Sequence, residues 1–337
     1  MIDQPRFRLP ADWEPRSATL LAWPGVEHRQ LQQQLVEFYQ KLIGLLRQHE
    51  PVWLLAPPDE KAAIAAMLGG EDESLHIEPI LTNDLWMRDA GPISVLDGDS
   101  RPVILDGNFN GWGNKYPHEL DRLIPNVLAR RLGLERVRMP ITVEGGAIEV
   151  NGHGELLTTE SVLLNPNRNN PDHSTVTATL KSFLGVEHVH WLPGGLSGDD
   201  TDGHVDNLVR FVGPDRLVVV SPDLPHDHPD RPMLAENCAR LQTMTLTTGR
   251  PELIELPLPE VLGGDGRRLP ASYANFHQAP GVVLVPQFGH NADQKALAVL
   301  ASVFPDDRVE GLDCRALVEL GGTLHCISQP LRLESKT

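Results

Sequence analysis

The sequence is poor in cysteine, with only three among its 337 residues, at positions 238, 314 and 326. Such spacing fits neither a disulfide framework nor a CxxC zinc site. Positive charge is also scarce, because 29 lysines and arginines face 46 aspartates and glutamates, which gives a formal net charge of −17. An acidic surface repels phosphate backbones, and no basic run interrupts it. We therefore expect no nucleic-acid partner.

Long apolar runs are absent as well. The longest, such as residues 218–220 and 282–285, are far shorter than the roughly 20 residues that cross a bilayer. The first 17 residues contain no apolar core of the kind found in secretory signal peptides. We expect a reduced, cytoplasmic protein without membrane contact.

Helical and extended patterns alternate along the chain, which is typical of the α/β class. In the clearest helical pattern, Leu31, Leu35, Phe38, Leu42 and Leu45 form one apolar stripe. Helices are predicted at 27–49, 60–68, 120–132, 174–184, 233–243 and 293–304. Strands are predicted at 18–23, 52–56, 93–96, 103–105, 147–150, 156–159, 208–212, 217–220, 282–286 and 324–328.

No linker or low-complexity segment divides the chain, since its glycines and prolines are scattered. We predict one catalytic domain over residues 1–337, with a core of about 6–330. The segment 221–232 is predicted to be a long surface loop. Two units, 49–57 and 280–286, share an apolar strand that stops at proline, which hints at a structural repeat.

Four glycine-punctuated segments carry the titratable residues of interest. They are 86–92, 144–147, 199–207 and 321–327. Cys326 lies in a short apolar run, where a cysteine is commonly an inert core residue. The neighbouring His325 would point to the opposite face of a strand, so any activating base must come from elsewhere in the chain.

His204 and Asp206 are two positions apart, which places both side chains on one face of an extended segment. They suit a general acid/base beside a cation-binding carboxylate. They also suit two metal ligands, although a third ligand is not defined, or a solvated aspartate-rich turn. Asp89 and Glu144 each precede glycine and a strand, where a carboxylate is often only a turn or cap residue.

The four segments together supply one nucleophile, one histidine and three carboxylates, a set that fits a cysteine hydrolase. A neutral ester or peptide needs at most one orienting acid. A planar guanidinium, by contrast, is matched by two carboxylates that accept its N–H groups in pairs. No phosphate-binding or dinucleotide motif accompanies the set.

With these residues in place, the sequence resembles the agmatine deiminase branch of the guanidine-modifying (pentein) superfamily, which includes bacterial-type peptidylarginine deiminase. The matching motifs follow one another along nearly the whole chain. They lie at 7–10, 21–24, 86–89, 144–146, 157–160, 164–168, 201–207, 270–276, 285–289 and 325–327.

The resemblance implies five ββαβ modules around a pseudo-fivefold axis, with the site at the centre. It implies that Cys326 is the nucleophile, His204 the general acid/base and Glu144 the group that orients it. Asp89 and Asp206 would grip the guanidinium. Trp86 would wall the substrate channel, and Arg88 is a further candidate substrate ligand.

The chemistry implied is hydrolysis of a small cationic guanidino compound through a covalent thiouronium on Cys326. Agmatine would give N-carbamoylputrescine and ammonia, a step of polyamine synthesis. No metal and no organic cofactor is implied. The sequence is compatible with a homo-oligomer. Two positions, Ala90 and Thr323, depart from the family pattern, and we expect them to line the approach to the site.

Three alternatives follow. The same fold could act on free arginine, peptidyl-arginine or another guanidine, or transfer the amidino group; free arginine would need a cation for its carboxylate, such as Arg88 or Arg168. The protein could instead be a catalytically silent binding or scaffold member. A metallohydrolase using His204 and Asp206 is the third, and it predicts inhibition by chelators.

Overall fold

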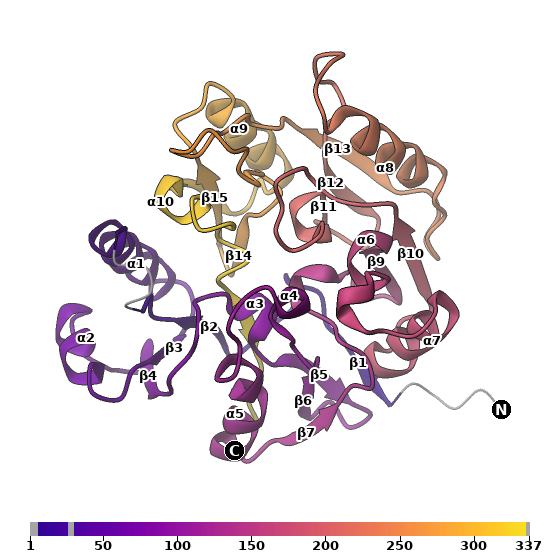
Figure 1. Ribbon diagram of the computed structural model, residues 1–337. Helices are drawn as coiled ribbons and strands as arrows, with labels where there is room; N and C mark the ends of the chain where they lie inside the picture. Colours follow the sequence, from indigo (N-terminus) through magenta and orange to yellow (C-terminus); the bar gives the residue numbers. More distant parts are fainter. Residues whose placement is uncertain (1–5, 26–29, 335–337) are drawn as a thin grey trace.

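Five small β-sheets surround the centre of the molecule in the computed structural model (Figure 1). The structure describes residues 6–25 and 30–334. Each sheet contains an antiparallel pair of strands and, beyond a helix, a third strand that runs parallel to the second. The α/β class and the five ββαβ modules are therefore confirmed.

The first two modules occupy the N-terminal part of the chain and share elements with both of its ends. The first contains β17 (Gln329–Leu331), β2 (Ala18–Ala22), α1 (Gln32–Leu46), β3 (Val52–Ala56), α2 (Lys61–Met67) and β4 (Leu75–Pro79). The second contains β1 (Phe7–Arg8), β5 (Ile93–Asp97), β6 (Pro102–Asp106), α5 (Ile124–Leu132) and β7 (Glu135–Arg138).

The remaining modules follow in chain order. The third contains β8 (Glu149–Val150), β9 (Glu155–Thr159), α7 (His173–Leu184) and β10 (His188–Leu192). The fourth contains β11 (Val209–Phe211), β12 (Arg216–Val220), α8 (Arg231–Thr243) and β13 (Glu252–Leu256). The fifth contains β14 (His277–Ala279), β15 (Val282–Gln287), α9 (Asp293–Val303) and β16 (Arg308–Asp313). Two short helices connect modules, α3 (Met87–Ala90) and α10 (Arg315–Val318), and two lie within modules, α4 (Gly111–Asn114) before α5 and α6 (Glu160–Leu163) before α7.

The ring is closed by strands from the two ends of the chain. β17 pairs antiparallel with β2, so that Gln329 lies opposite Leu20. β1 pairs antiparallel with β5, and Phe7 lies opposite Asp97. Because Cys326 stands three residues before β17, this pairing fixes the catalytic candidate at the centre of the ring.

The predicted strand at 324–328 is wrong, because residues 324–327 form turns and the strand begins only at Gln329. The apolar residues of this segment are buried in the central core rather than in a sheet. The helix predicted at 27–49 is described as α1, and its first residues, up to 29, lie outside the described part. The segment 120–132 divides into a 3-10 turn at Asp121–Leu123 and α5.

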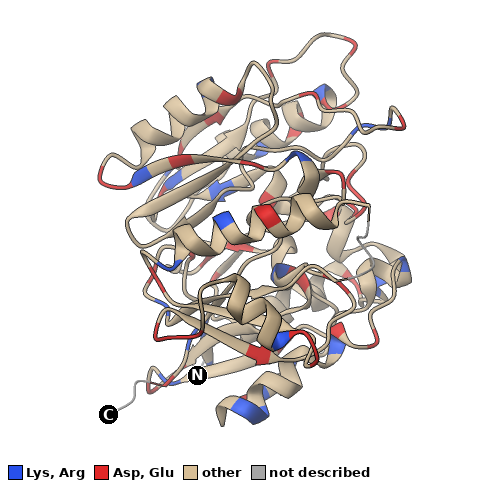
Figure 2. Ribbon diagram, turned by 90° about the vertical axis from the view of Figure 1, so that its left-hand side faces the viewer, with Lys and Arg blue, Asp and Glu red and all other residues tan. Residues whose placement is uncertain are grey.

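The predicted loop at 221–232 is confirmed up to the start of α8, which takes in Pro232 in its first turn. Basic and acidic residues are interspersed over the elements (Figure 2). Within the described ranges, none of the helices has both the length and the apolar character needed to span a membrane.

Candidate active site

Four short connections meet at the centre of the ring and carry the residues singled out from the sequence. They are α3, the 3-10 turn Gly145–Ala147, the 3-10 turn Val205–Asn207 and the turn at 324–327. The Arg88 amide donates to the Cys326 carbonyl (3.0 Å) and so joins α3 to the cysteine turn. The Gly146 amide donates to Asp89 Oδ1 (3.0 Å) and joins α3 to the glutamate segment.

Cys326 is buried, and its sulfur is held by the fully buried Asn275. Asn275 Nδ2 donates to Sγ at 3.1 Å, while Oδ1 accepts from Thr323 Oγ1 (2.7 Å) and from the His325 amide (3.1 Å). This one amide thus shapes the turn and solvates the sulfur. Burial, together with the charges of Asp206 and Asp89, holds the thiol pKa well above its usual value. The empty site therefore contains a neutral thiol.

Asn275→Asp is expected to slow the reaction of Cys326 with iodoacetamide at a fixed pH near 8. The substitution keeps the size of the side chain but replaces the N–H that faces sulfur with a carboxylate oxygen. One unit of additional rise in the thiol pKa lowers the thiolate fraction about tenfold. Mass spectrometry of Cys326 alkylation against time measures the rate. An unchanged rate would show that the Asn275 contact does not influence the sulfur.

Asp89 is oriented from two sides. Trp112 Nε1 donates to Oδ2 (2.9 Å), and the Gly146 amide holds Oδ1. Burial raises the pKa of Asp89 to about 6 despite these donors. A carboxylate held so firmly in a buried site is prepared to accept N–H groups from a cation.

Asp206 is fully buried, and one of its oxygens, Oδ1, has no hydrogen-bond partner in the part of the chain that the structure describes. Oδ2 lies 2.7 Å from Nδ1 of His325 and 3.9 Å from the sulfur of Cys326. Burial and the neighbouring Asp89 raise the pKa of Asp206 well above its usual range. A bound cation would relieve this repulsion between the two carboxylates.

His204 is fully buried, and neither of its ring nitrogens has a hydrogen-bond partner among residues 6–25 and 30–334. Its Nδ1 lies 3.6 Å from Asp89 Oδ1. Burial lowers the pKa of the imidazole, and the charge of Glu144 opposes that effect. A neutral histidine with both nitrogens uncommitted can exchange protons with a bound substrate.

Glu144 is positioned by Arg168 rather than by the histidine. Arg168 Nε donates to Oε1 at 2.7 Å, and both side chains are completely buried. Oε2 has no partner, and no hydrogen bond joins Glu144 to His204. The charge of Glu144 therefore acts on His204, but no direct bond joins the two side chains, and Arg168 holds only the Oε1 atom of the carboxylate.

Gly146 lies where the three groups converge. A Cβ atom at this position would lie 2.5 Å from His204 Nδ1, 2.8 Å from Asp89 Oδ1 and 3.1 Å from Asp206 Oδ2. Real Cβ atoms do not approach other atoms so closely. The glycine is therefore required by the close approach of the catalytic candidates to the backbone.

A pocket of about 50 Å³ leads to these groups and is lined by aromatic and acidic side chains. Trp86 lines it as predicted. Ala90 and Thr323 do not line it, which corrects our expectation for both positions: Ala90 is buried in α3, and the Thr323 hydroxyl is engaged with Asn275. The lining residues are Asp84, Trp86, Asp89, Trp112, Tyr116, Asp200, Thr201, Leu320, Gly321 and Cys326.

Arg88 lies elsewhere, which argues against its prediction as a substrate ligand. Its guanidinium pairs with Asp12 at 3.2 Å and lines a different pocket. Arg168 is likewise committed to Glu144 and Asp202. Neither arginine is free to bind the carboxylate of an arginine substrate. Within the described residues, no group of three or more histidine, cysteine or acidic side chains has the geometry of a metal site.

The sequence did not reveal the roles of four side chains of this centre, which act through long-range contacts. They are Asn275, Trp112, Arg168 and His325. The motif at 270–276 and the arginine at 168 were noticed in the sequence, but nothing in their spacing indicated those contacts. His325 was dismissed because a strand was expected where the chain turns.

Known proteins resemble this chain over nearly its whole length. The family described as Porphyromonas-type peptidyl-arginine deiminase matches residues 8–331. An agmatine deiminase from Ectopseudomonas mendocina is 31% identical, over 96% of this chain and 95% of its own. The solved agmatine deiminase of Enterococcus faecalis is 26% identical with a TM-score of 0.88, covering 97% of each chain.

A second solved structure, an agmatine deiminase of C. jejuni with substrate bound, is 28% identical with a TM-score of 0.89 and covers 97% of each chain. DDAH from Pseudomonas aeruginosa, at 15% identity and a TM-score of 0.52 over 95% of this chain and 100% of its own, shares the fold alone. Together with the five sheets, these likenesses confirm the pentein fold.

Proposed function

The chain belongs to the Porphyromonas-type peptidyl-arginine deiminase family, and from this premise we propose that it hydrolyses agmatine to N-carbamoylputrescine and ammonia. The observation that carries the proposal is the arrangement around Cys326. Two buried carboxylates, Asp89 and Asp206, and a histidine with uncommitted nitrogens, His204, converge on one glycine beside the thiol. This is a site for a planar cation next to a nucleophile.

The first step is attack of the Cys326 sulfur on the guanidinium carbon. The thiol is neutral in the empty site, so activation depends on the substrate, whose positive charge lowers the thiol pKa. Asp89 and Asp206 accept the N–H groups and hold the carbon against sulfur. The S–H proton passes to His204 as the S–C bond forms, and His204 then donates it to the departing nitrogen as the C–N bond breaks and ammonia leaves.

The second step hydrolyses the S-alkylthiouronium that remains. His204, now lacking its proton, removes one from water, and the hydroxide adds to the central carbon. The C–S bond then breaks, sulfur leaves, and the ureido product is released. His204 thus acts first as acid and then as base. Glu144 stabilises its protonated form through charge.

The tail of the substrate is constrained by the charge of the pocket. Its lining includes the carboxylates Asp84, Asp89 and Asp200, and none of the described residues that line it is a lysine, arginine or histidine. An aminoalkyl tail with a terminal ammonium suits such a lining, whereas the α-carboxylate of free arginine would be repelled.

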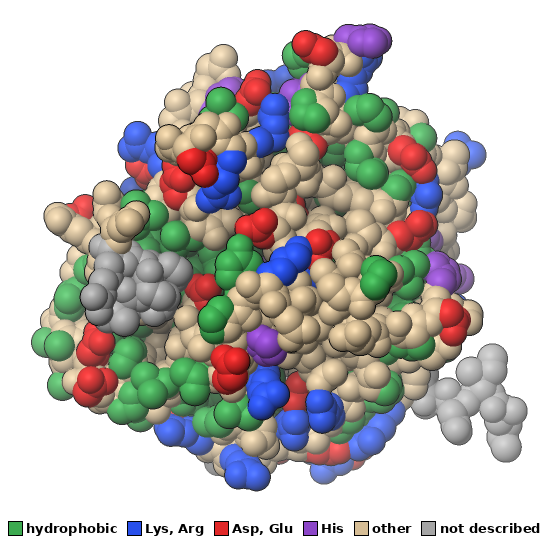
Figure 3. Space-filling model, in the orientation of Figure 1, with side chains coloured by type: hydrophobic (Ala, Val, Ile, Leu, Met, Phe, Trp, Pro, Cys, Tyr) green, Lys and Arg blue, Asp and Glu red, His purple; other side chains and the backbone are tan. Residues whose placement is uncertain are grey.

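A larger cavity of about 570 Å³ lies elsewhere and does not fit this substrate. Its lining includes Arg122, Arg136 and Arg138, which repel a cation, and it does not include Cys326. Basic side chains gather along the lower edge of the face in Figure 3. The acidic pocket at Cys326 is therefore the site that we assign to the substrate.

Ammonia release from a panel of guanidines tests this assignment. We expect purified protein, with a chelator present, to release ammonia from agmatine with a kcat/KM at least about 100-fold above that for arginine, because arginine adds a repelled carboxylate near the acidic lining. Blocked peptidyl-arginine and a simple guanidinoalkane complete the panel. Preference for arginine would refute the tail assignment, and loss of activity with chelator would favour metal-dependent hydrolysis.

A further inference from the structure

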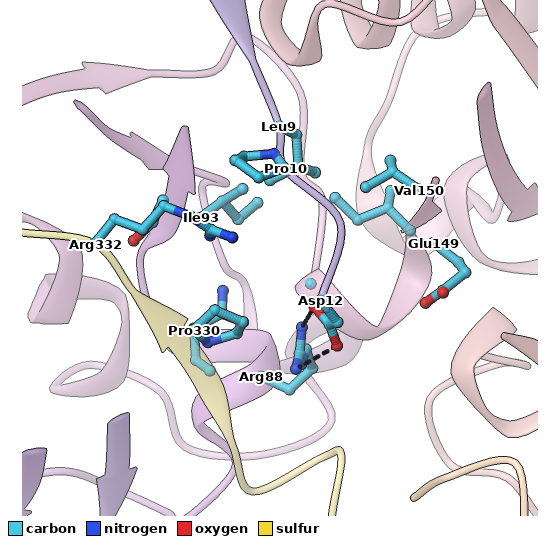
Figure 4. A pocket seen from close by; sticks show the side chains of 13 residues that line it. Leu9, Pro10, Asp12, Arg88, Ile93, Glu149, Val150, Pro330 and Arg332 are labelled. Carbon is cyan, nitrogen blue, oxygen red and sulfur yellow. Dashed lines mark hydrogen bonds and ion pairs between the residues drawn. The ribbon is translucent and has the colours of Figure 1, made fainter. Parts of the chain in front are cut away.

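A second pocket lies between the N-terminal segment, β5 and β17, and Arg88 of α3 also lines it (Figure 4). Its volume is about 40 Å³, which is room for roughly two or three water molecules. Three of its lining residues have a buried polar atom without a hydrogen-bond partner: Ser94 Oγ, Gln329 Oε1 and Arg332 Nε.

These three atoms favour water over an ion as the occupant. Gln329 Nε2 donates to the carbonyl of Pro92 (2.9 Å), which leaves its oxygen as an acceptor. Arg332 Nε is a donor, and the Ser94 hydroxyl can do either. Water satisfies donors and acceptors together, whereas an anion would leave the glutamine oxygen unsatisfied.

A chain of short contacts connects this pocket to the substrate-binding carboxylate. Asp206 Oδ2 lies 2.7 Å from His325 Nδ1, and His325 Nε2 lies 2.8 Å from Asp12 Oδ2. Asp12 lines the second pocket, where Figure 4 shows it paired with Arg88. Arg210 Nη2 also donates to Asp12 (2.9 Å).

The charged groups around Asp206, His325 and Asp12 determine which of these three side chains carry a proton. Burial and the charges of Arg210 and Arg88 lower the pKa of His325 well below its usual value, so its ring is neutral. Burial alone would raise the pKa of Asp12, but Arg88 and His325 outweigh it and keep Asp12 ionised. Burial and Asp89 raise the pKa of Asp206 well above its usual range. Because both nitrogens of one neutral imidazole lie within hydrogen-bond distance of a carboxyl oxygen, one of the two carboxyl groups must hold a proton, and this is Asp206. The charged or titratable groups that act on Asp206 are Asp89, Asp199, Arg88, Arg210, His325 and Cys326.

A neutral imidazole donates from only one nitrogen, and this fixes the direction of both bonds. His325 Nε2–H donates to the ionised Asp12, and Nδ1 accepts from the protonated Asp206. Asp206 must lose this proton before it can pair with a guanidinium. The bound substrate then occupies the pocket at Cys326 and so blocks the direct path of this proton to solvent.

We propose that the proton of Asp206 leaves through His325 and Asp12 to water in the second pocket when the cationic substrate binds. The inference rests on the proposed function. The O–H bond of Asp206 breaks as an Nδ1–H bond forms on His325, and the Nε2 proton passes to Asp12 and then to water. The imidazole is neutral before and after. One cation enters the buried centre and one proton leaves it, so its net charge is conserved.

Rapid mixing of agmatine with Cys326→Ser, which lacks the nucleophile, tests the route. Tryptophan fluorescence reports binding beside Trp86 and Trp112, and a pH indicator reports released protons. We expect release of about one proton per bound cation near neutral pH, at the rate of the fluorescence change. No proton release between pH 5 and 8 would overturn the proposal.

Two further variants test the path that the proton takes, separately from the number of protons released on binding. His325→Asn keeps an amide that can accept from or donate to Asp206 but cannot pass a proton on. Ser94→Val adds bulk to the second pocket and leaves the pocket at Cys326 unchanged. In both, proton release should lag behind the fluorescence change by on the order of tenfold or more. Ser94→Ala, which leaves the space open, is the matched control and should show no lag. Simultaneous signals in both test variants would refute the route.

Failure of the proposed function has a different signature. If wild-type protein hydrolyses another guanidine rather than agmatine, that guanidine replaces it in the mixing experiment. If no guanidine changes the fluorescence, the substrate assignment itself is wrong, and the proton route falls with it. Circular dichroism spectra of His325→Asn and Ser94→Val confirm that each variant is folded before its kinetics are interpreted.

Discussion

Cys326→Ser is expected to abolish ammonia release from agmatine, with a fall in kcat on the order of 10⁴-fold or more, because it removes the nucleophile of both steps. A serine hydroxyl has nearly the size of the thiol and can still meet Asn275. The fold and the binding of the cation should therefore persist. Residual turnover is measured by coupled ammonia detection, and binding by calorimetry.

The same cysteine provides a control on the mechanism. Because the thiol pKa is raised in the empty site, its thiolate fraction at pH 7 is below that of a free cysteine and grows as the pH rises. Iodoacetamide should therefore modify Cys326 slowly at pH 7 and progressively faster above pH 9. Rapid modification at pH 6 would contradict substrate-dependent activation. Full turnover by Cys326→Ser would disprove covalent catalysis.

Gly146→Ala is expected to lower kcat/KM by at least on the order of 100-fold, because a displacement of about 1 Å in a catalytic group can cost that much. The added methyl group would press on His204 and on both guanidinium-binding carboxylates at once. Since the three groups lie on two separate segments, 86–92 and 199–207, no single shift relieves all the contacts. Steady-state kinetics with agmatine measure the loss, and thermal unfolding measures stability.

Gly44→Ala is the matched control for this substitution. Gly44 lies within α1, and a Cβ atom there meets nothing within 4 Å. Replacing a helical glycine by alanine stabilises a helix by about 0.5–1 kcal/mol, and activity should not change. Normal kinetics of Gly146→Ala would contradict the description of His204, Asp89 and Asp206 as packed closely against the backbone at Gly146.

The sequence was informative where side-chain chemistry and a local pattern coincide. The strands at 52–56 and 217–220 are confirmed by β3 and β12, since both are continuous apolar runs bordered by proline or charge. The charged strand β7 was missed because its side chains are half-buried or exposed at a sheet edge and show no alternation. Four segments predicted to carry the chemistry are brought together by the fold.

What the sequence could not define is how these segments contact one another. In the sequence, Asn275 is an ordinary polar residue. Its role is evident only in the folded protein, where the cysteine turn wraps around its amide. The apolar residues at 324–327 follow a strand pattern, yet burial at the centre of the ring comes from turns. Pairing between Glu144 and Arg168 is equally invisible, because ion pairs between distant segments leave no periodic signal in the sequence.

Closure of the ring by β17 also has a consequence for biosynthesis. The carboxylates and the histidine of the site are translated long before Cys326, so a nascent chain holds the cation-binding groups without the nucleophile. Until β17 is made, one edge of the apolar strand β2 stays unpaired. An exposed strand edge invites aggregation, and pairing between segments so distant in sequence is slow to form. The sheet of the first module can therefore be completed only after residues 329–331 have been translated.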